Sequence, residues 1–232
     1  MKRSEINRIM RSAKKLLARH QFHLPPFAVW TPDEWRAKGP EVREIAGNQL
    51  GWDITDFGSG DFLRRGLFLF TVRNGRPANL HAMQGKTYAE KIMIVEVEQV
   101  TPLHFHWQKT EDIINRGGGR LIVQLYNSTP DDQLAKTEIT VSLDGVSRKV
   151  SAGGTVKLSP GESITLPPRL YHAFWGEGGR VLVGEVSTVN DDRTDNRFFE
   201  SIGRFPQIIE DEPPLHLLTM DYTKYYRDLP RQ

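Results

Sequence analysis

The sequence predicts an all-β protein, a sandwich or closed barrel of short strands preceded by N-terminal helices. Two observations lead to this prediction. Before residue 50, apolar residues recur at helical spacing, whereas from Gly51 onward short β-rich runs alternate with Gly, Pro and Asp. The strand-like runs also follow one another closely, with no long helical pattern between them. This spacing is typical of a sandwich or barrel and argues against alternating βα units.

The 232 residues fit one large domain as well as two small ones. No internal repeat, low-complexity tract or break in composition marks a second domain. We therefore expect a single domain over residues 1–232. Within it we expect an N-terminal helical extension (1–50), the barrel (51–200) and a C-terminal tail (201–232) that is packed or loosely docked.

The N-terminal extension contains two expected helices. The first begins near Ser4, its candidate N-cap, and is stopped by Pro25-Pro26. Its many basic residues also fit a transit peptide or a membrane-surface helix. The pattern runs on without a cleavage signal, so we expect an ordinary amphipathic helix. A second, short helix starts at the capping box Thr31-Pro32-Asp33-Glu34 and ends near Gly39-Pro40.

Turn residues separate the expected strands. Asn74-Gly75 follows a strand over 66–72 and indicates a hairpin-like turn, and Gly117-Gly118-Gly119 predicts a tight connection. Asp144-Gly145 is the strongest local hairpin signal and joins strands over 138–143 and 146–150. The other expected strands cover 91–97, 100–107, 121–126, 155–158, 162–166 and 181–186.

Composition limits the chemistry and the partners. The chain has no Cys, which excludes a disulfide framework, a zinc finger, an iron–sulfur cluster and a thiol nucleophile. Any metal must therefore be held by nitrogen and oxygen ligands. The net charge of +2 argues against nucleic acid as a partner, and no apolar run approaches the roughly 20 residues of a membrane span. We expect a cytoplasmic protein.

The residues most informative about function lie in Thr101–Glu111 and Gly161–His172. His104 and His106 are two apart in an expected strand, so both imidazoles point to one face. A lone His-x-His pair is more often packed or hydrogen bonded than metal bound. Glu111 and the distant His172 favour a metal site here. Three imidazoles and one carboxylate suit Mn²⁺, Fe²⁺, Co²⁺, Ni²⁺ or Zn²⁺.

These two stretches resemble the paired motifs of the cupin superfamily, which consists of small jelly-roll β barrels. The resemblance implies a cupin jelly-roll β barrel with N-terminal helices. It also implies the metal ligands His104, His106, Glu111 and His172. The sequence departs from the motifs at turns, where Glu98 and Arg169 replace glycines and Gly176 replaces an asparagine.

A closer resemblance, over nearly the whole chain, is to the D-lyxose isomerase family of the cupin type. It implies interconversion of D-lyxose and D-xylulose, activity on D-mannose and D-fructose, a preference for Mn²⁺, and a homodimer. A cupin fold alone does not define an activity, so the extended matches are what make this resemblance specific. They lie at Leu24–Ala28, Gly51–Phe62, Glu90–Glu96, Glu111–Gly119 and Val189–Arg193.

An aldose–ketose isomerase needs groups that move a proton between two carbons. Glu185, among Val and Leu residues, is our candidate base, although it could equally pair with a neighbouring strand. Lys109 lies two residues from Glu111 and is a candidate proton donor to O1 or O2; its alternative is a solvated loop lysine. Lys91 is a candidate contact to sugar hydroxyls, with a cross-strand Lys–Glu pair as its alternative.

Three further residues are candidate substrate contacts. Trp107 offers an apolar face to a sugar ring, although Trp is more often a core residue. Tyr171 is a candidate hydroxyl donor beside His172. Asp192 lies in the charged run 190–197, which is either a segment that closes over the sugar or simply a charged surface loop.

Other functions stay open at this point. The same ligands suit an iron-dependent cupin dioxygenase, and a non-catalytic cupin would bind a sugar without turnover. A phosphosugar isomerase would need a phosphate site, of which Gly117-Gly118-Gly119 with Arg116 and Arg120 is the one sign. The sequence also does not separate a cis-enediol route from a metal-assisted hydride shift.

Overall fold

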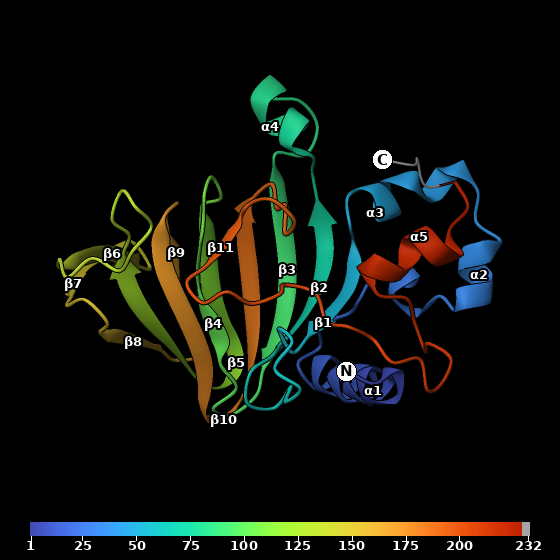
Figure 1. The fold of residues 1–232 in the computed structure, drawn as a ribbon, viewed down its shortest axis with the longest axis horizontal. Helices are drawn as coiled ribbons and strands as arrows, with labels where there is room; N and C mark the ends of the chain where they lie inside the picture. Colours follow the sequence, from blue (N-terminus) through green and yellow to red (C-terminus); the bar gives the residue numbers. More distant parts are fainter. Residues whose placement is uncertain (229–232) are drawn as a thin grey trace.

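The computed structural model describes residues 1–228, so the last four residues of the expected tail lie outside it. An antiparallel sheet of eleven strands curls into a barrel (Figure 1), which confirms the all-β prediction. The strands are β1 (Gly51–Thr55), β2 (Leu67–Asn74), β3 (Tyr88–Val95), β4 (Thr101–His106), β5 (Glu111–Asn127), β6 (Ile139–Leu143), β7 (Val146–Val150), β8 (Thr155–Leu158), β9 (Ser163–Leu166), β10 (Leu170–Thr188) and β11 (Asn196–Phe198).

The long strands β5 and β10 form the spine of the barrel. They pair with each other from Leu170 opposite Asn127 to Ser187 opposite Glu111. The second half of β10 also pairs with β3, and its first half pairs with β4. β10 therefore belongs to both of the layers that face each other across the barrel. The space between the layers holds the largest apolar core, with members from nearly every strand. Side chains that point inward from β4, β5 and β10 therefore face a common interior.

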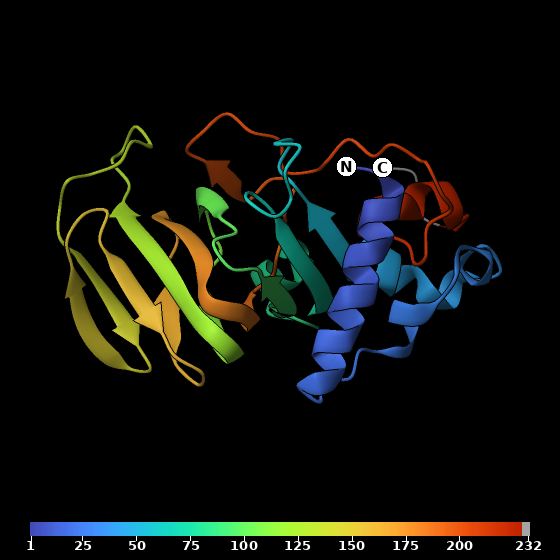
Figure 2. The ribbon, with the colours of Figure 1, turned by 90° about the horizontal axis from the view of Figure 1, so that it is seen from below.

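The described residues form five α-helices, and all but the fourth lie on one side of the barrel (Figure 1). They are α1 (Arg3–Arg19), α2 (Pro32–Arg36), α3 (Arg43–Gly47), α4 (Pro77–Ala82) and α5 (Tyr222–Tyr225), with 3₁₀ turns at Pro26–Val29, Pro40–Val42 and Thr219–Asp221. Helix α1 lies along the outer face of β1–β3 (Figure 2) and buries Ile6, Met10 and Leu17 against Trp52 and Phe68. This packing is that of an ordinary amphipathic helix.

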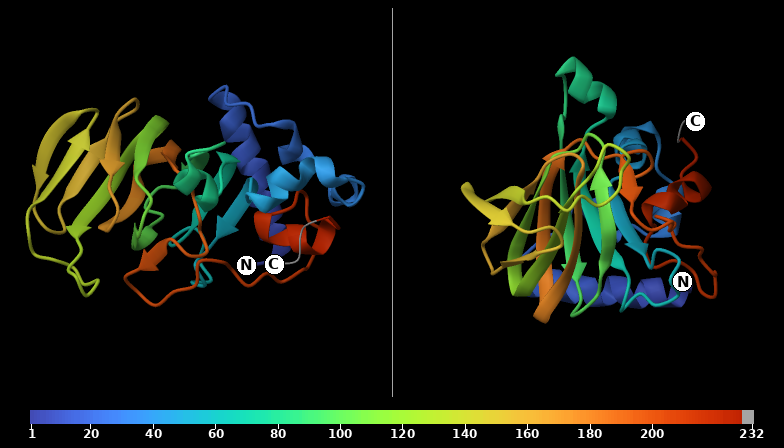
Figure 3. Two further views of the ribbon diagram at one scale, coloured as in Figure 1. Left: turned by 90° about the horizontal axis from the view of Figure 1, so that it is seen from above. Right: turned by 60° about the vertical axis from the view of Figure 1, so that its left-hand side comes forward.

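The C-terminal tail packs beside the N-terminal helices. Tyr222 and Tyr226 are buried against Trp35 of α2, which begins with the expected capping box at Thr31. The backbone of Arg3 donates to Ile209, so the start of α1 lies beside the first part of the tail (Figure 3).

The expected N-cap at Ser4 is wrong. Helix α1 starts at Arg3, and Ser4 lies inside its first turn. The backbone N–H and the hydroxyl of Ser4 both donate to the carboxylate of Asp211, at 2.9 and 2.7 Å. The acceptor at this helix start therefore comes from the tail, more than two hundred residues away, which local sequence does not reveal.

The Asp144-Gly145 hairpin is confirmed. β6 and β7 pair antiparallel, with Leu143 opposite Val146, and both turn residues have positive φ. The other two glycine-based predictions are wrong. Helix α4 is inserted between β2 and β3 and protrudes from the barrel (Figure 1). The segment between β2 and β3 that carries α4 forms a protruding arm. Gly75 lies at its base, where a Cβ atom would be 1.8 Å from the carbonyl oxygen of Lys86.

The Gly117–Gly119 run lies within β5 and forms no tight connection. At Gly118 a Cβ atom would lie 2.0 Å from the carbonyl oxygen of Arg180. The pairing of β5 with β10 shifts register in this region. These glycines therefore let two strands approach closely at an irregular pairing. Separately, no helix among residues 1–228 has the length and apolar character needed to cross a membrane.

Candidate active site

A cavity inside the barrel has two chemically different linings. Its apolar lining consists of Phe57, Leu67, Leu69, Met93, Ile113, Phe174 and Phe198. Its polar lining consists of Lys91, Thr101, His104, His106, Lys109, Glu111, His172, Glu185, Asp192, Asn196 and Arg204. This pattern, largely apolar walls with convergent polar groups, is typical of small-molecule sites.

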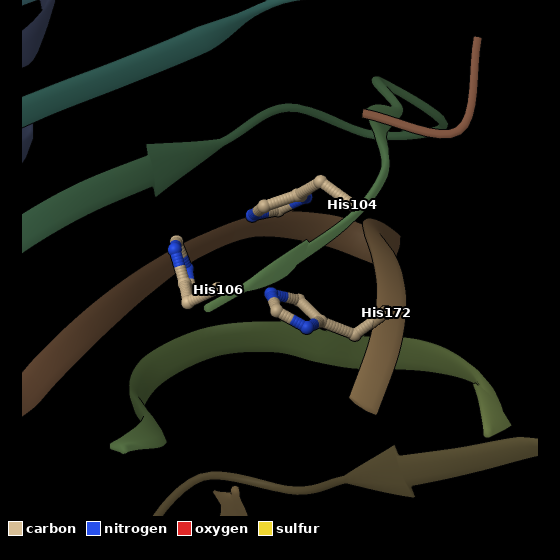
Figure 4. A group of neighbouring side chains, drawn as sticks. All are labelled: His104, His106 and His172. Atoms are coloured by element: carbon tan, nitrogen blue, oxygen red, sulfur yellow. The ribbon is translucent and has the colours of Figure 1, made fainter. Parts of the chain in front are cut away.

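The three predicted histidines converge in this cavity (Figure 4). His104 and His106 come from β4, and His172 comes from β10 directly opposite His104. One nitrogen from each ring belongs to a group whose members all lie within 4.8 Å of one another. The two-residue spacing in β4 brings two imidazoles to this face, as expected.

Backbone carbonyls orient each of the three rings. Nδ1 of His104 lies 2.8 Å from the oxygen of Pro102, and Nδ1 of His172 lies 3.0 Å from the oxygen of Leu170. Nδ1 of His106 lies 3.0 Å from the oxygen of Asp195. Since a carbonyl only accepts, Nδ1 carries the proton in each ring and Nε2 keeps its lone pair for the interior.

Glu111, the first residue of β5, completes the cluster. Its Oε1 lies 3.1 Å from Nε2 of His172 and 3.4 Å from Nε2 of His106. Nε2 of His172 is buried without a hydrogen-bond partner among the described residues. Lone pairs of nitrogen and oxygen that face each other in a buried place repel unless a cation lies between them. The four residues therefore fit a divalent metal ion with nitrogen and oxygen ligands.

Burial and neighbouring charges keep His104 and Glu111 in the forms that a metal requires. Burial, and then the neighbouring rings His172 and His106, hold the pKa of His104 well below its usual range. Burial acts to raise the pKa of Glu111, but the Lys109 ammonium and the contacts with His106 and His172 together outweigh it, and the pKa lies well below its usual value. The imidazole of His104 is thus neutral and the carboxylate of Glu111 is ionised near pH 7.

Lys109 links the metal cluster to the candidate base. Its Nζ lies 2.6 Å from Oε2 of Glu111 and 2.8 Å from Oε1 of Glu185. The lysine side chain is 2% exposed, so the alternative of a solvated loop lysine is wrong. Burial acts to lower the pKa of Lys109, but Glu111, Glu185 and Asp192 outweigh it and raise the pKa above its usual value.

Glu185 forms the expected pair with a neighbouring strand and also lies in the cavity, where a base would be needed. It lies opposite Lys91 in the β10–β3 pairing, with Lys91 Nζ 3.3 Å from its Oε1, so the cross-strand pair exists. The same pair also lines the cavity. Within the described residues, the hydrogen bonds of the Glu185 carboxylate use Oε1, which leaves Oε2 for a ligand.

Asp192 belongs to the cavity and is not a surface-loop residue. Its side chain is 12% exposed and lies 3.7 Å from the ammonium of Lys91 and 3.4 Å from the guanidinium of Arg204. Burial acts to raise the pKa of Asp192, but Lys91 and Arg204 outweigh it and lower the pKa well below its usual value. The charged run 190–197 therefore brings a carboxylate into the interior of the barrel.

Three residues that sequence reasoning missed support this arrangement. Arg204, from the expected tail, lines the cavity and pairs with Asp53 at 2.6 Å. The side-chain oxygen of Asn190 accepts from Lys91 at 2.6 Å and from Lys109 at 3.3 Å. The carboxylate of Asp195 accepts from the backbone of Gln108 and Lys109 and so holds the loop before Glu111. The charged run 190–197 was the one available signal for Asn190 and Asp195.

Two predicted substrate contacts, Trp107 and Tyr171, do not line the cavity. Tyr171 precedes His172 in β10, so its side chain points to the opposite face, packs against Phe105 and donates to the carbonyl of Asp132. Trp107 is 38% exposed and contacts the outer face of Phe105. The prediction for Tyr171 followed its nearness to His172 in sequence, whereas neighbours in a strand point to opposite faces.

The suggested phosphate site also lies elsewhere. Arg120 pairs with Glu177 at the exposed surface, and Arg116 packs along Gly184. Neither arginine lines the cavity.

Comparison with known sequences shows close relatives over almost the full length. A family model described as D-lyxose isomerase matches residues 1–222. A D-lyxose/D-mannose isomerase of Serratia proteamaculans is 52% identical over 97% of this chain and 99% of its own length. A D-lyxose/D-mannose isomerase of Escherichia coli O157:H7 is 50% identical over 97% of this chain and 100% of its own length.

Solved structures with a similar fold include two L-ribose isomerases. The enzyme of Cellulomonas parahominis with L-ribose has a TM-score of 0.59 at 19% identity, covering 90% of this chain and 98% of that one. A mutant enzyme of Acinetobacter sp. DL28 in complex with L-ribose has a TM-score of 0.61 at 16% identity, covering 89% and 98%. At these identities the likeness concerns the fold.

Proposed function

The chain belongs to the D-lyxose isomerase family, a family of aldose–ketose isomerases, and we propose that it interconverts D-lyxose with D-xylulose and D-mannose with D-fructose. The observation that carries this proposal is the contact chain Glu111–Lys109–Glu185, which links the candidate metal ligands to a second carboxylate within one cavity. An isomerase of this kind needs a cation site, a base and an acid next to one another.

Each polar group has a role in the proposed reaction. Glu185 removes a proton from C2 of the aldose and returns it to C1, and its Oε2 is the oxygen left for this transfer. Lys109 is protonated; it donates a proton to O1 as negative charge develops there and regains one from the O2 hydroxyl as C2 becomes the carbonyl carbon. A divalent ion held by His104, His106, Glu111 and His172 would supply Lewis-acid stabilisation of charge on the O1 and O2 atoms.

The remaining groups bind an uncharged sugar. Lys91 and Asp192 offer a donor and an acceptor to hydroxyl groups, while the apolar lining accommodates C–H groups. Each of the cavity cations Lys91, Lys109 and Arg204 already contacts a carboxylate. A phosphosugar would bring two further negative charges to these neutralised cations, so free sugars are the better substrates.

The decisive experiment uses protein stripped with a chelator and reloaded with one metal at a time. We expect turnover of free D-lyxose, highest with Mn²⁺ and lower with Co²⁺, Fe²⁺, Ni²⁺ or Zn²⁺, and essentially none on phosphorylated sugars. Turnover that survives full metal removal would contradict the proposal. Oxygen uptake with iron would instead indicate a dioxygenase, and ketose binding without turnover would indicate a binding protein.

We propose a cis-enediol intermediate in preference to a hydride shift, because Glu185 and Lys109 lie next to each other as base and acid. In ²H₂O the product ketose should carry deuterium at C1. Complete absence of deuterium at C1 and C2 would favour the hydride shift and count against Glu185 as the base.

We further propose that the enzyme works in the cytoplasm, and that it is a homodimer, as the family resemblance implies. The protruding arm around α4 offers an apolar contact in Met83, which is 77% exposed. Sedimentation velocity on the wild type and on Met83→Glu tests this state, and a monomeric wild type at micromolar concentration contradicts it.

A further inference from the structure

Thr101, the first residue of β4, has a buried hydroxyl that no other residue within 1–228 uses. The residue is 2% exposed, lines the cavity and lies opposite Phe174 in the pairing of β4 with β10. Its Oγ1 atom has no hydrogen-bond partner among the described residues. The large majority of buried side-chain hydroxyls are paired, because an unpaired one forfeits its hydration without compensation. An unpaired hydroxyl on the wall of a binding cavity calls for an explanation.

A β-bulge points this hydroxyl toward the site. His104 lies opposite His172 and Thr101 lies opposite Phe174, so two residues of β4 stand against one residue of β10. Regular alternation would put Thr101 and His104, three residues apart, on opposite faces. Because of the extra residue, the side chain of Thr101 points to the same inner face as the histidines of the metal cluster. Such a bulge is a usual means of re-aiming a side chain at a functional site.

We propose that the Thr101 hydroxyl hydrogen-bonds a hydroxyl of the bound sugar beyond C2. This inference rests on the proposed isomerase function, in which the O1 and O2 atoms of the sugar would be bound by the divalent ion and by Lys109. A threonine hydroxyl donates and accepts, as a sugar hydroxyl does, so the two groups match. Phe174, which lies opposite Thr101, and Phe57, which also lines the cavity, are both buried and contribute to an apolar lining.

The test is Thr101→Val, which replaces the hydroxyl with a methyl group of similar shape. We expect kcat/KM for D-lyxose to fall roughly threefold to tenfold, the loss of one ordinary hydrogen bond. The melting temperature should stay the same or rise, because an unpaired buried hydroxyl is removed. Thr101→Ser keeps the hydroxyl and should stay within about twofold of wild type, well inside the value of one hydrogen bond.

Deoxy sugars identify the partner. Of the 3-deoxy, 4-deoxy and 5-deoxy derivatives of D-lyxose, one should be a poorer substrate than D-lyxose for the wild type and lose nothing further in Thr101→Val. A matched control is Thr55→Val. Thr55 is also fully buried, but its Oγ1 accepts from the backbone of Phe57 at 2.9 Å, so this variant should lose stability.

Two outcomes overturn the inference. One is an active wild type with an unchanged kcat/KM in Thr101→Val. The other is a Thr101→Val variant that loses stability as Thr55→Val does and shows the same loss on every deoxy sugar, since that pattern indicates a structural hydroxyl. A wild type that turns over no free aldose instead overturns the proposed function, and this inference with it.

Discussion

Two clusters of buried charge in this chain are built in opposite ways. In the terminal cluster, Arg3 is fully buried. Its Nη1 and Nη2 donate to the two oxygens of Asp221 at 2.9 Å, and Nε and Nη2 also donate to Glu210. In the cavity cluster, a single oxygen of Glu185 contacts the ammonium groups of both Lys109 and Lys91.

The difference separates a structural ion pair from a reactive one. Arg3 uses four of its five N–H donors on Asp221 and Glu210, and it is fully buried and does not line the cavity. The cavity cluster shares partners, leaves Oε2 of Glu185 available, and lines a space for a small molecule. Buried charge alone therefore does not mark an active site; incomplete pairing beside a cavity does.

The largest effect should come from Glu185→Gln. The amide oxygen still accepts from Lys109, but the group no longer takes up a proton. We expect kcat to fall about 10²- to 10⁴-fold, the usual contribution of a general base, with little change in melting temperature. Steady-state rates and a thermal unfolding curve measure both. A kcat within tenfold of wild type would remove Glu185 from the proposed role.

Arg3→Met tests the terminal cluster and should show the reverse pattern. It leaves Asp221, which is 7% exposed, without its cation. The free energy of unfolding should drop by about 3–5 kcal/mol, as for other broken buried pairs. Below the melting transition, kcat should match wild type. Urea unfolding together with kinetics on folded protein checks this, and a parallel loss of kcat would show that the two clusters are coupled.

Sequence reasoning succeeded where a pattern is local. The His-x-His spacing in β4 predicted a shared face, and Asp144-Gly145 predicted its hairpin. It failed where a distant segment decides the local structure. Asp211 provides the acceptor at the start of α1, and nothing near Arg204 indicates that the tail returns to the barrel.

Strand alternation also limits what sequence proximity implies. Tyr171 is next to His172 and yet faces away from it, because neighbours in a strand lie on opposite faces. Thr101 shows the opposite case. Regular alternation would point its side chain away from the cavity, but a bulge in β4 points it inward. Bulges depend on the pairing of two strands, so a single sequence does not reveal them.

Tyr171→Phe sharpens this distinction with a smaller effect. The variant loses the hydrogen bond from Tyr171 to the carbonyl of Asp132, 2.8 Å long. We expect about 1 kcal/mol less stability, the ordinary net value of one hydrogen bond. Values of kcat/KM for D-lyxose should be unchanged, since the side chain does not line the cavity. A clear loss of kcat/KM at unchanged stability would return Tyr171 to the substrate site.

The smallest effect should come from Glu210→Gln, at the exposed edge of the terminal cluster. The Glu210 side chain is 42% exposed, so its pair with Arg3 should contribute below about 1 kcal/mol. The hydrogen bond from Arg3, only partly opposed by burial, lowers the pKa of Glu210 in the folded state. A carboxylate with a lowered folded pKa stabilises the protein above its unfolded pKa of about 4.3, and this contribution disappears as pH falls through the folded value.

The difference in unfolding free energy between wild type and Glu210→Gln should therefore be present at pH 7 and shrink toward zero in acid. Urea unfolding of both proteins at neutral pH and near pH 3 measures this difference, and other acid effects cancel in the comparison. A difference that persists in acid would mean that Glu210 acts through packing and not through its charge. The terminal cluster would then depend on the Arg3–Asp221 pair alone, with Glu210 serving only to cover it.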